Sequence, residues 1–196
     1  MTLRARLEAR LGPGIKPGAV LWDLDNTLID RDSAAAAVFR EASRSPERQA
    51  KLAKLDDHGR GDRESLFQAW RSHTGQPLDQ AGWARALCRH LQPDLQLISD
   101  LQELSLDYKM AIVTNGGGET QRAKIRAAGL DRVFSPELIF ISGERGWSKP
   151  DPRLFRLACN RLNVAPSCAA MVGDQLETDG KGAEAAGLSF VLAGQL

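Results

Sequence analysis

The sequence predicts an α/β protein: a Rossmann-like parallel five-stranded sheet with helices on both faces, plus an inserted helical segment. Short apolar runs such as residues 20–22 are bounded by turn residues, and runs of this kind are typical of buried strands in a parallel sheet. Their alternation with helical stretches predicts right-handed βαβ units. The five strands are expected at residues 19–24, 110–113, 138–141, 169–172 and 189–192.

Helices are expected at the start of the chain and between the strands. Residues 2–11 are predicted as a short amphipathic helix, because Leu3, Leu7 and Leu11 recur at helical spacing among charged residues. The charged run Arg122–Arg126 is interpreted as a solvated helix face. After residue 93 the expected helices are 94–106, 119–128, 152–162 and 175–186.

Residues 32–92 differ in composition from the rest of the chain. They are rich in Arg, Ala and Gln, poor in β-branched residues, and contain no strand pattern, so we expect a helical insertion. Ser33 is the expected N-cap of its first helix, 34–42. The expected domains are therefore an α/β core of residues 1–31 and 93–196 and a helical domain of residues 32–92.

The composition argues against several functional classes. The 196 residues are 42% hydrophobic and 26% charged, and the formal net charge of +1 argues against binding nucleic acid or a membrane through bulk charge. No apolar run approaches the roughly 18 residues of a membrane span, and we see no signal peptide. Three cysteines without a CxxC pair suit a reducing compartment, so we expect a cytoplasmic protein.

Two carboxylates follow the first strand. Asp23 and Asp25 stand two residues apart at its end, and Thr27 comes next. Ligands of open α/β sheets bind outside the carboxyl ends of the strands, and two acids there repel each other unless a cation lies between them. We therefore expect Mg²⁺, which prefers oxygen ligands, with the hydroxyl of Thr27 orienting one acid. The alternative is a turn in which Asp23 and Asn26 bond only the local backbone.

Polar residues also follow three other expected strands. Thr114 and Asn115 precede three glycines after the second strand, Lys149 follows the third, and Asp174 and Asp179 follow the fourth. The ends of parallel strands share one edge of the sheet, so these side chains should converge although they are far apart in sequence.

This set of side chains suggests phosphoryl transfer. A hydroxyl, glycine-loop N–H groups and one ammonium can hold phosphate oxygens, and a cation between Asp23 and Asp174 would neutralise developing charge. One carboxylate would be free to attack and form an aspartyl-phosphate. Asp25 would protonate the leaving oxygen and later deprotonate the attacking water.

Four segments together resemble a known family. Asp23–Thr27, Thr114–Gly116, Lys149–Pro152 and Gly173–Asp179 resemble the four motifs of the haloacid dehalogenase-like hydrolase superfamily in order and strand placement. The resemblance covers residues of about 19–192. It implies that the helical insertion is similar to the family's small helical cap, which closes over the site and excludes water.

The resemblance implies roles for the acids. Asp23 would be the nucleophile and a metal ligand, and Asp25 the general acid/base with its backbone carbonyl on the Mg²⁺ ion. Asp174 would be the third protein ligand, and Asp179 would support the metal shell through water or Lys149. Members that cleave carbon–halogen bonds lack the second acid and the metal, so Asp25 favours a phosphatase over a dehalogenase.

For the substrate, the resemblance implies a phosphate site. Thr114, Asn115 and Gly116 would bind phosphate, and Lys149 would stabilise the charge on nucleophile and phosphate. The expected protein is a Mg²⁺-dependent phosphatase acting on a small phosphorylated metabolite, such as a sugar phosphate or a nucleotide.

Two other functions stay open at this stage. A phosphotransferase or mutase would form the same aspartyl-phosphate and pass the phosphate to a sugar hydroxyl, and a non-catalytic binding protein is a further alternative, since fold does not fix function. The sequence also leaves open the physiological substrate, the oligomeric state, and whether Arg60, Arg63 or Trp147 contacts the substrate.

Overall fold

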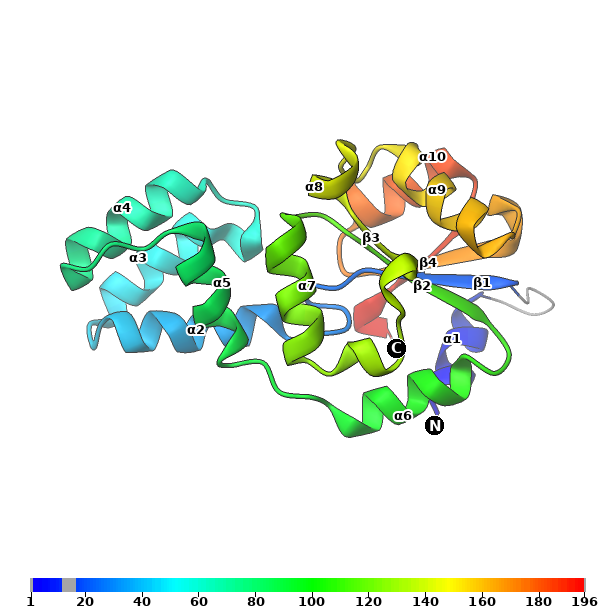
Figure 1. Cartoon of the computed structure of the whole chain (residues 1–196), viewed down its shortest axis with the longest axis horizontal. Coiled ribbons are helices and arrows are strands. Elements are labelled where there is room, and N and C mark those ends of the chain that lie inside the picture. The colour runs from blue at the N-terminus through cyan, green and yellow to red at the C-terminus, as the bar shows by residue number, and fades with distance from the viewer. Residues whose placement is uncertain (1, 12–16, 196) are drawn as a thin grey trace. The chain divides into compact units, whose positions relative to one another are not determined.

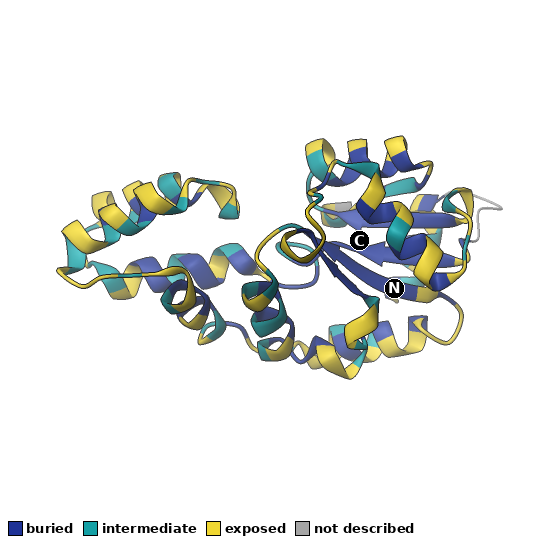
Figure 2. Cartoon of the chain, turned by 45° about the horizontal axis from the view of Figure 1, so that its top comes forward, coloured by how far each residue is buried: buried dark blue, intermediate teal, exposed yellow. Residues whose placement is uncertain are grey.

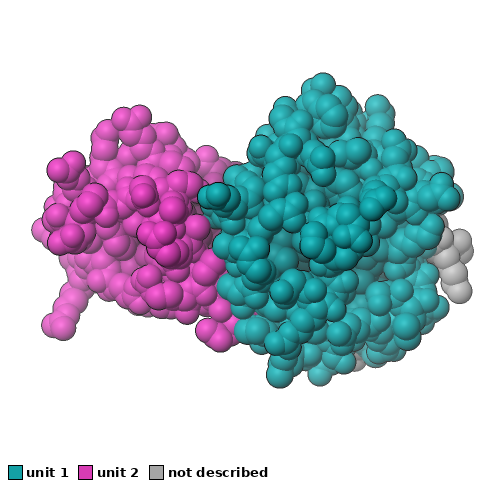
Figure 3. Space-filling model, viewed as in Figure 1, with its two compact units in different colours: residues 1–29, 93–196 teal, residues 30–92 magenta. Residues whose placement is uncertain are grey.

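The computed structural model describes residues 2–11 and 17–195, and the chain divides into two compact units (Figure 3). The α/β unit comprises Met1–Ile29 and Pro93–Leu196, and the helical unit comprises Asp30–Gln92. Among the described residues, no helix combines the length and the apolar character needed to cross a bilayer.

The α/β unit is built on a sheet of five parallel strands, so the predicted fold class is confirmed (Figure 1). The strands are β1 (Ala19–Trp22), β2 (Lys109–Thr114), β3 (Ile139–Ile141), β4 (Ala169–Gly173) and β5 (Ser189–Leu192), in the order β3-β2-β1-β4-β5. Trp22, the last residue of β1, lies opposite Ile112 in β2 and Val172 in β4. The segment after β1 therefore emerges between the ends of its two neighbours.

Helices cover both faces of this sheet. The helices are α1 (Leu3–Leu11), α6 (Leu95–Leu104), α7 (Gly118–Ala127), α8 (Ser142–Arg145), α9 (Pro152–Leu162) and α10 (Lys181–Ala186). Figure 1 shows α9 and α10 on one face and α1 and α6 on the other. On the α9 face, Phe155 and Leu154 pack with Leu21, Val113 and Met171 in one buried cluster. Burial on both faces explains why the inner strands β1 and β4 carry no polar side chain (Figure 2).

The N-terminal helix belongs to the core of the α/β unit. Leu3, Leu7 and Leu11 are buried, as their spacing predicted, and α1 packs against α6 and β5. The hydroxyl of Tyr108 donates to Glu8 Oε1 at 2.8 Å, which joins the helix to the turn before β2.

The expected helix at 175–186 is not a single α-helix. A π-helical turn, Leu176–Gly180, comes first, and α10 begins only at Lys181. The N–H groups of Asp179 and Gly180 both donate to the carbonyl of Gln175, which widens the turn. Such turns are frequent at functional sites.

The helical unit consists of four helices and a short 3₁₀ turn. They are α2 (Arg31–Ala42), α3 (Pro46–Asp56), the turn Asp57–Gly59, α4 (Arg63–Thr74) and α5 (Gln80–Cys88). The prediction that Ser33 caps the first helix is wrong. The carboxylate of Asp30 is the N-cap and accepts the N–H of Ser33 at 2.9 Å, so the helix begins three residues earlier than expected.

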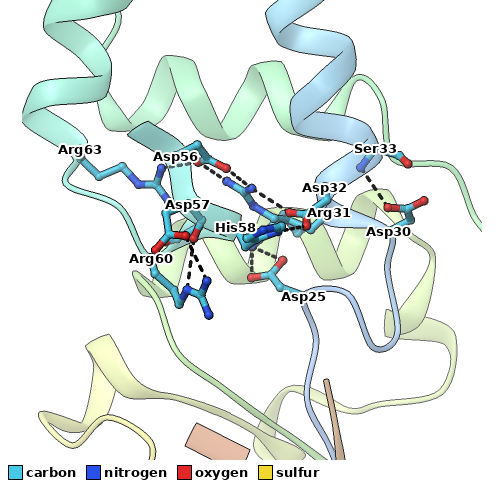
Figure 4. A network of polar contacts seen from close by, with 12 residues as sticks. Asp25, Asp30, Arg31, Asp32, Ser33, Asp56, Asp57, His58, Arg60 and Arg63 are labelled. Atoms are coloured by element: carbon cyan, nitrogen blue, oxygen red, sulfur yellow. Dashed lines mark hydrogen bonds and ion pairs between the residues drawn. The ribbon is translucent and has the colours of Figure 1, made fainter. Parts of the chain in front are cut away.

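A buried ion network lies inside the helical unit (Figure 4). The guanidinium of Arg31 contacts both carboxylate oxygens of Asp56, with Nη2 at 2.5 Å from Oδ1, and Nη1 of Arg63 is 2.7 Å from the same oxygen. Both guanidinium carbons lie 5.8 Å from the ring centroid of Trp83. Burial favours the neutral carboxyl, but the bonds from the two arginines outweigh it and hold the pKa of Asp56 below its usual value.

Replacing Asp56 with Asn should lower the free energy of unfolding by about 3–5 kcal/mol, because the buried guanidinium of Arg31 then loses its buried counter-charge and keeps the half-exposed Asp32 at 3.2 Å. The lowered pKa also sets a pH dependence. The stabilisation from Asp56 is fully present above its unfolded pKa of 3.8 and is lost as the pH falls through the lower folded pKa. Urea unfolding followed by circular dichroism should show this acid-dependent loss in the wild type and a smaller loss in Asp56→Asn.

The matched control is Asp57→Asn in the same loop. The side chain of Asp57 is 53% exposed and pairs with Arg60, so its removal should cost less than about 1 kcal/mol. Its backbone has a φ of 43°, a conformation that Asn tolerates. Equal destabilisation by the two variants would show that the buried network does not stabilise the unit.

Candidate active site

Asp23 stands at the end of the central strand. Its N–H donates to the carbonyl of Val172 in β4 at 2.8 Å, which continues the β1–β4 ladder by one residue, and its side chain is buried. The chain then turns tightly, since the N–H groups of Leu28 and Ile29 both donate to the carbonyl of Leu24. The turn carries Asp25 directly beyond the sheet edge.

A buried ammonium lies between two carboxylates at this edge. Nζ of Lys149 is 2.5 Å from Asp23 Oδ1, 2.6 Å from Asp179 Oδ1 and 3.0 Å from the carbonyl oxygen of Val113. An ammonium has three N–H donors, so these contacts account for all of them. Burial alone lowers the pKa of a lysine, but the two carboxylates outweigh it, and the pKa of Lys149 is raised.

A third carboxylate, that of Asp174, joins the two that bind this ammonium. Asp23, Asp174 and Asp179 each offer an oxygen within 4.8 Å of the others. Oδ1 of Asp174 is buried and has no hydrogen-bond partner within the described residues. Burial raises the pKa of Asp23 to about 7, against the opposing effect of Lys149, and burial together with Asp179 raises that of Asp174. A divalent cation beside Asp23 and Asp174 would favour their ionised forms and so lower both pKa values. Carboxylate oxygens are also the ligands that Mg²⁺ prefers.

The π-helical turn brings Asp179 to this cluster. The side chain of Asp179 accepts the N–H of Gln175 at 3.1 Å and lies against Gly173 at the end of β4. A Cβ at Gly173 would come within 2.2 Å of Asp179 Oδ2, so only glycine leaves room for the carboxylate. The direct contact of Asp179 with Lys149 is one of the two arrangements that the sequence suggested.

The second strand ends in side chains that hold their neighbours. Thr114 is buried, and Asn115 binds the backbone of Lys149 twice, through Nδ2 to its carbonyl at 3.0 Å and through Oδ1 to its N–H at 2.8 Å. Asn115 therefore fixes the segment that delivers the ammonium. The N–H of Gly116, expected to bind phosphate, instead donates to the hydroxyl of Ser142 at 3.0 Å.

Thr27 does not make the contact expected of it. Its hydroxyl is buried and forms no hydrogen bond with any described residue, so it orients neither Asp23 nor Asp25 here. Trp147 and two arginines of the helical unit, Arg60 and Arg63, have partners within their own units. The guanidinium of Arg153 lies 4.9 Å from the ring centroid of Trp147, Arg60 binds Asp57, and Arg63 binds Asp56.

Two residues that the sequence analysis did not single out bind Asp25. Gln121 donates to Asp25 Oδ2 at 3.0 Å, and Lys124 donates to both carboxylate oxygens. The interpretation of 122–126 as a solvated face is thus wrong at Lys124, which is 3% exposed. A signal existed, because residues 121, 124, 125 and 128 have the i, i+3, i+4, i+7 spacing of a buried helix face.

A family model of haloacid dehalogenase-like hydrolases matches residues 17–187, and the chain belongs to this family of enzymes.

Two relatives of the chain are phosphatases. The chain is 37% identical over 161 residues to phosphoserine phosphatase of Thermus thermophilus, covering 82% of this chain and 53% of that protein. It thus spans about half the length of that relative. It is 36% identical over 200 residues to human N-acylneuraminate-9-phosphatase, covering 87% of this chain and 79% of the relative. Among solved structures, the magnesium-bound HAD-hydrolase YfnB of Bacillus subtilis has a TM-score of 0.70 and 26% identity, covering 90% of this chain and 88% of that one.

Proposed function

We propose that this protein is a Mg²⁺-dependent phosphatase that hydrolyses a small phosphate monoester through an aspartyl-phosphate on Asp23. The observation that carries the proposal is the buried Lys149 bound to Asp23 within a cluster of three acids at the carboxyl edge of the sheet. Phosphatase names among the relatives support the same reaction.

The acids fit a divalent cation. Asp23 and Asp174 would hold Mg²⁺ with their carboxylates, and Asp25 would add its backbone carbonyl. Asp179 would support this shell through its contact with Lys149. The unpartnered buried oxygen of Asp174 supports this assignment, since a buried carboxylate oxygen without a partner is costly. When bound, the ion supplies charge neutralisation for the phosphate and the nucleophile.

The chain's own residues account for both half-reactions. A carboxylate oxygen of Asp23 attacks phosphorus, the bond between phosphorus and the ester oxygen breaks, and Asp25 gives its proton to that oxygen. Asp25 then takes a proton from water, which attacks the phosphoryl group and restores the Asp23 carboxylate. Lys149 offsets the charge on Asp23 and phosphate, and Thr114 and the backbone N–H of Asn115 would hold the phosphate oxygens.

The substrate class follows from the relatives and the domain organisation. Their names specify a phosphorylated amino acid and a phosphorylated sugar, and we extend only their common chemistry, a small phosphorylated metabolite. The helical unit, Asp30–Gln92, would serve as the family's cap and exclude water during transfer. The three free cysteines are compatible with work in the cytoplasm.

Asp23→Asn should lower the rate of phosphate release by at least about 10⁴-fold, because an amide cannot form the acyl phosphate. The assay measures inorganic phosphate from 4-nitrophenyl phosphate and from a panel of phosphorylated metabolites, with Mg²⁺ and with a chelator. Asp131→Asn, at an exposed carboxylate of the same unit, should keep the wild-type rate.

Three results would contradict the proposal. Near-normal turnover by Asp23→Asn would remove the nucleophile assignment. Transfer of phosphate to a sugar hydroxyl in place of water would indicate a phosphotransferase or mutase. No turnover of any phosphoester despite metal binding would indicate a binding protein on this fold.

Mg²⁺ should raise the melting temperature by about 5–10 °C at a concentration about 100 times its Kd, because the ion binds only the folded acid cluster. Asp174→Asn should remove most of this shift, measured by differential scanning fluorimetry. Glu177→Gln is the matched control, since its carboxylate lies in the same segment but is 73% exposed and pairs with Lys181. A full Mg²⁺ shift in Asp174→Asn would exclude Asp174 as a ligand.

A further inference from the structure

Helix α7 carries two buried polar side chains to which the proposed reaction assigns no role. Gln121 is 2% exposed and Lys124 is 3% exposed, although the same helix also has a solvent-exposed face. Burying an ammonium or an amide is costly unless its donors are bonded, so the partners of these groups indicate what they do.

The partner of Lys124 is the proposed general acid. Its Nζ lies 2.6 Å from Asp25 Oδ1 and 2.5 Å from Asp25 Oδ2, so the ammonium faces both oxygens. The lysine side chain is 4% exposed and that of Asp25 is 25% exposed. A charge-assisted contact to both oxygens restricts rotation of the carboxylate, while its remaining exposure leaves it accessible to a reactant.

Gln121 joins this carboxylate to the end of β2. Its Nε2 donates to Asp25 Oδ2 at 3.0 Å and to Thr114 Oγ1 at 2.7 Å. An amide nitrogen has two hydrogens, so both are used. The hydroxyl of Thr114 accepts from Gln121 and donates its own hydrogen to the carbonyl oxygen of Asn115 at 3.4 Å. One amide thus orients the proposed acid and a proposed phosphate-binding hydroxyl together.

The backbone of the β2 loop leaves room for this amide. Gly116 has a φ of 139°, and a Cβ there would lie 3.0 Å from Cδ of Gln121. Any other residue at this position would have a strained backbone, and its Cβ would crowd the Gln121 amide. The loop after β2 therefore needs glycine here for Gln121 to occupy its position. This steric fit is an observation independent of the hydrogen bonds, and it also indicates that the Gln121 side chain is held in one place.

We propose that Lys124 and Gln121 are positioning residues that hold the Asp25 carboxyl where it protonates the leaving oxygen, and so permit cleavage of esters whose alcohols are poor leaving groups. In the step, the bond from phosphorus to the ester oxygen breaks, and the proton of Asp25 passes to that oxygen. Asp25 is left as a carboxylate, whose charge Lys124 balances. The inference rests on the proposed phosphatase function and deepens it.

The test compares leaving groups. A 4-nitrophenolate departs with little help from an acid, whereas a phenolate gains more from protonation. The value of kcat/KM reports the steps up to the first departure, so hydrolysis of the aryl phosphates from phenyl to 4-nitrophenyl isolates the acid step. In the wild type with Mg²⁺, kcat/KM should depend weakly on leaving-group acidity.

Lys124→Met should make that dependence steep, with kcat/KM falling about 100-fold for phenyl phosphate and less than about 5-fold for 4-nitrophenyl phosphate. Lys124→Arg keeps a cationic donor, so its dependence on leaving-group acidity should again be weak. Its kcat/KM for phenyl phosphate should lie within about 10-fold of the wild-type value. Gln121→Met should act in the same direction as Lys124→Met and serves in its place if that variant does not fold. Arg126→Met, an exposed cation on the same helix, should match the wild type.

The outcomes separate this inference from the proposed function. If the wild type hydrolyses no aryl phosphate with Mg²⁺, the phosphatase proposal fails, and the inference fails with it. If the wild type is active but the variants lose activity equally on every ester, the two residues have only a structural role, and the inference alone is overturned. A gain on phenyl phosphate in Lys124→Met would also overturn it, because Lys124 would then restrain the acid.

Discussion

The ion pairs of Lys149 are the interaction on which the acid-rich edge of the sheet depends. Its ammonium bonds Asp23 after β1 and Asp179 in the π-helical turn after β4, and it also reaches the β2 carbonyl of Val113. Each carboxylate alone would carry the full cost of removing its charge from water. One cation therefore makes it possible to bury acids from distant segments together, and Asn115 holds that cation in place from the backbone side.

Close backbone approach is the second constraint. Gly173 leaves the space that Asp179 fills, and Gly116 leaves the space beside Gln121. Both glycines stand at or just after the ends of strands, where the side chains of the next helical segment come back toward the sheet edge. The absence of a Cβ at these points leaves the space in which the side chains of Asp179 and Gln121 pack.

The sequence predicted the features that depend on the spacing of apolar residues within one segment and on the geometry of parallel sheets. Apolar runs located the strands, and the common edge of parallel strands brought Asp23, Lys149 and Asp174 together as expected. The errors have local causes. Both Asp30 and Ser33 can cap a helix, and Asp30 is the residue that does so. Lys124 was expected in solvent because of its charge, although its position in the helical repeat places it on the buried face. The catalytic and metal-binding roles stay proposals.

By itself the sequence determined the fold class, the family and the residue types at each strand end, because these depend on patterns within short segments and on the order of the motifs. Only the tertiary structure decided that Lys124, 99 residues along the chain from Asp25, is its ion-pair partner, and that Gly116 gives its N–H to Ser142. Such contacts depend on how a helix is rotated and how far a loop extends against the sheet. The helical repeat can place Lys124 on a buried face, but packing decides which group of another segment it meets there.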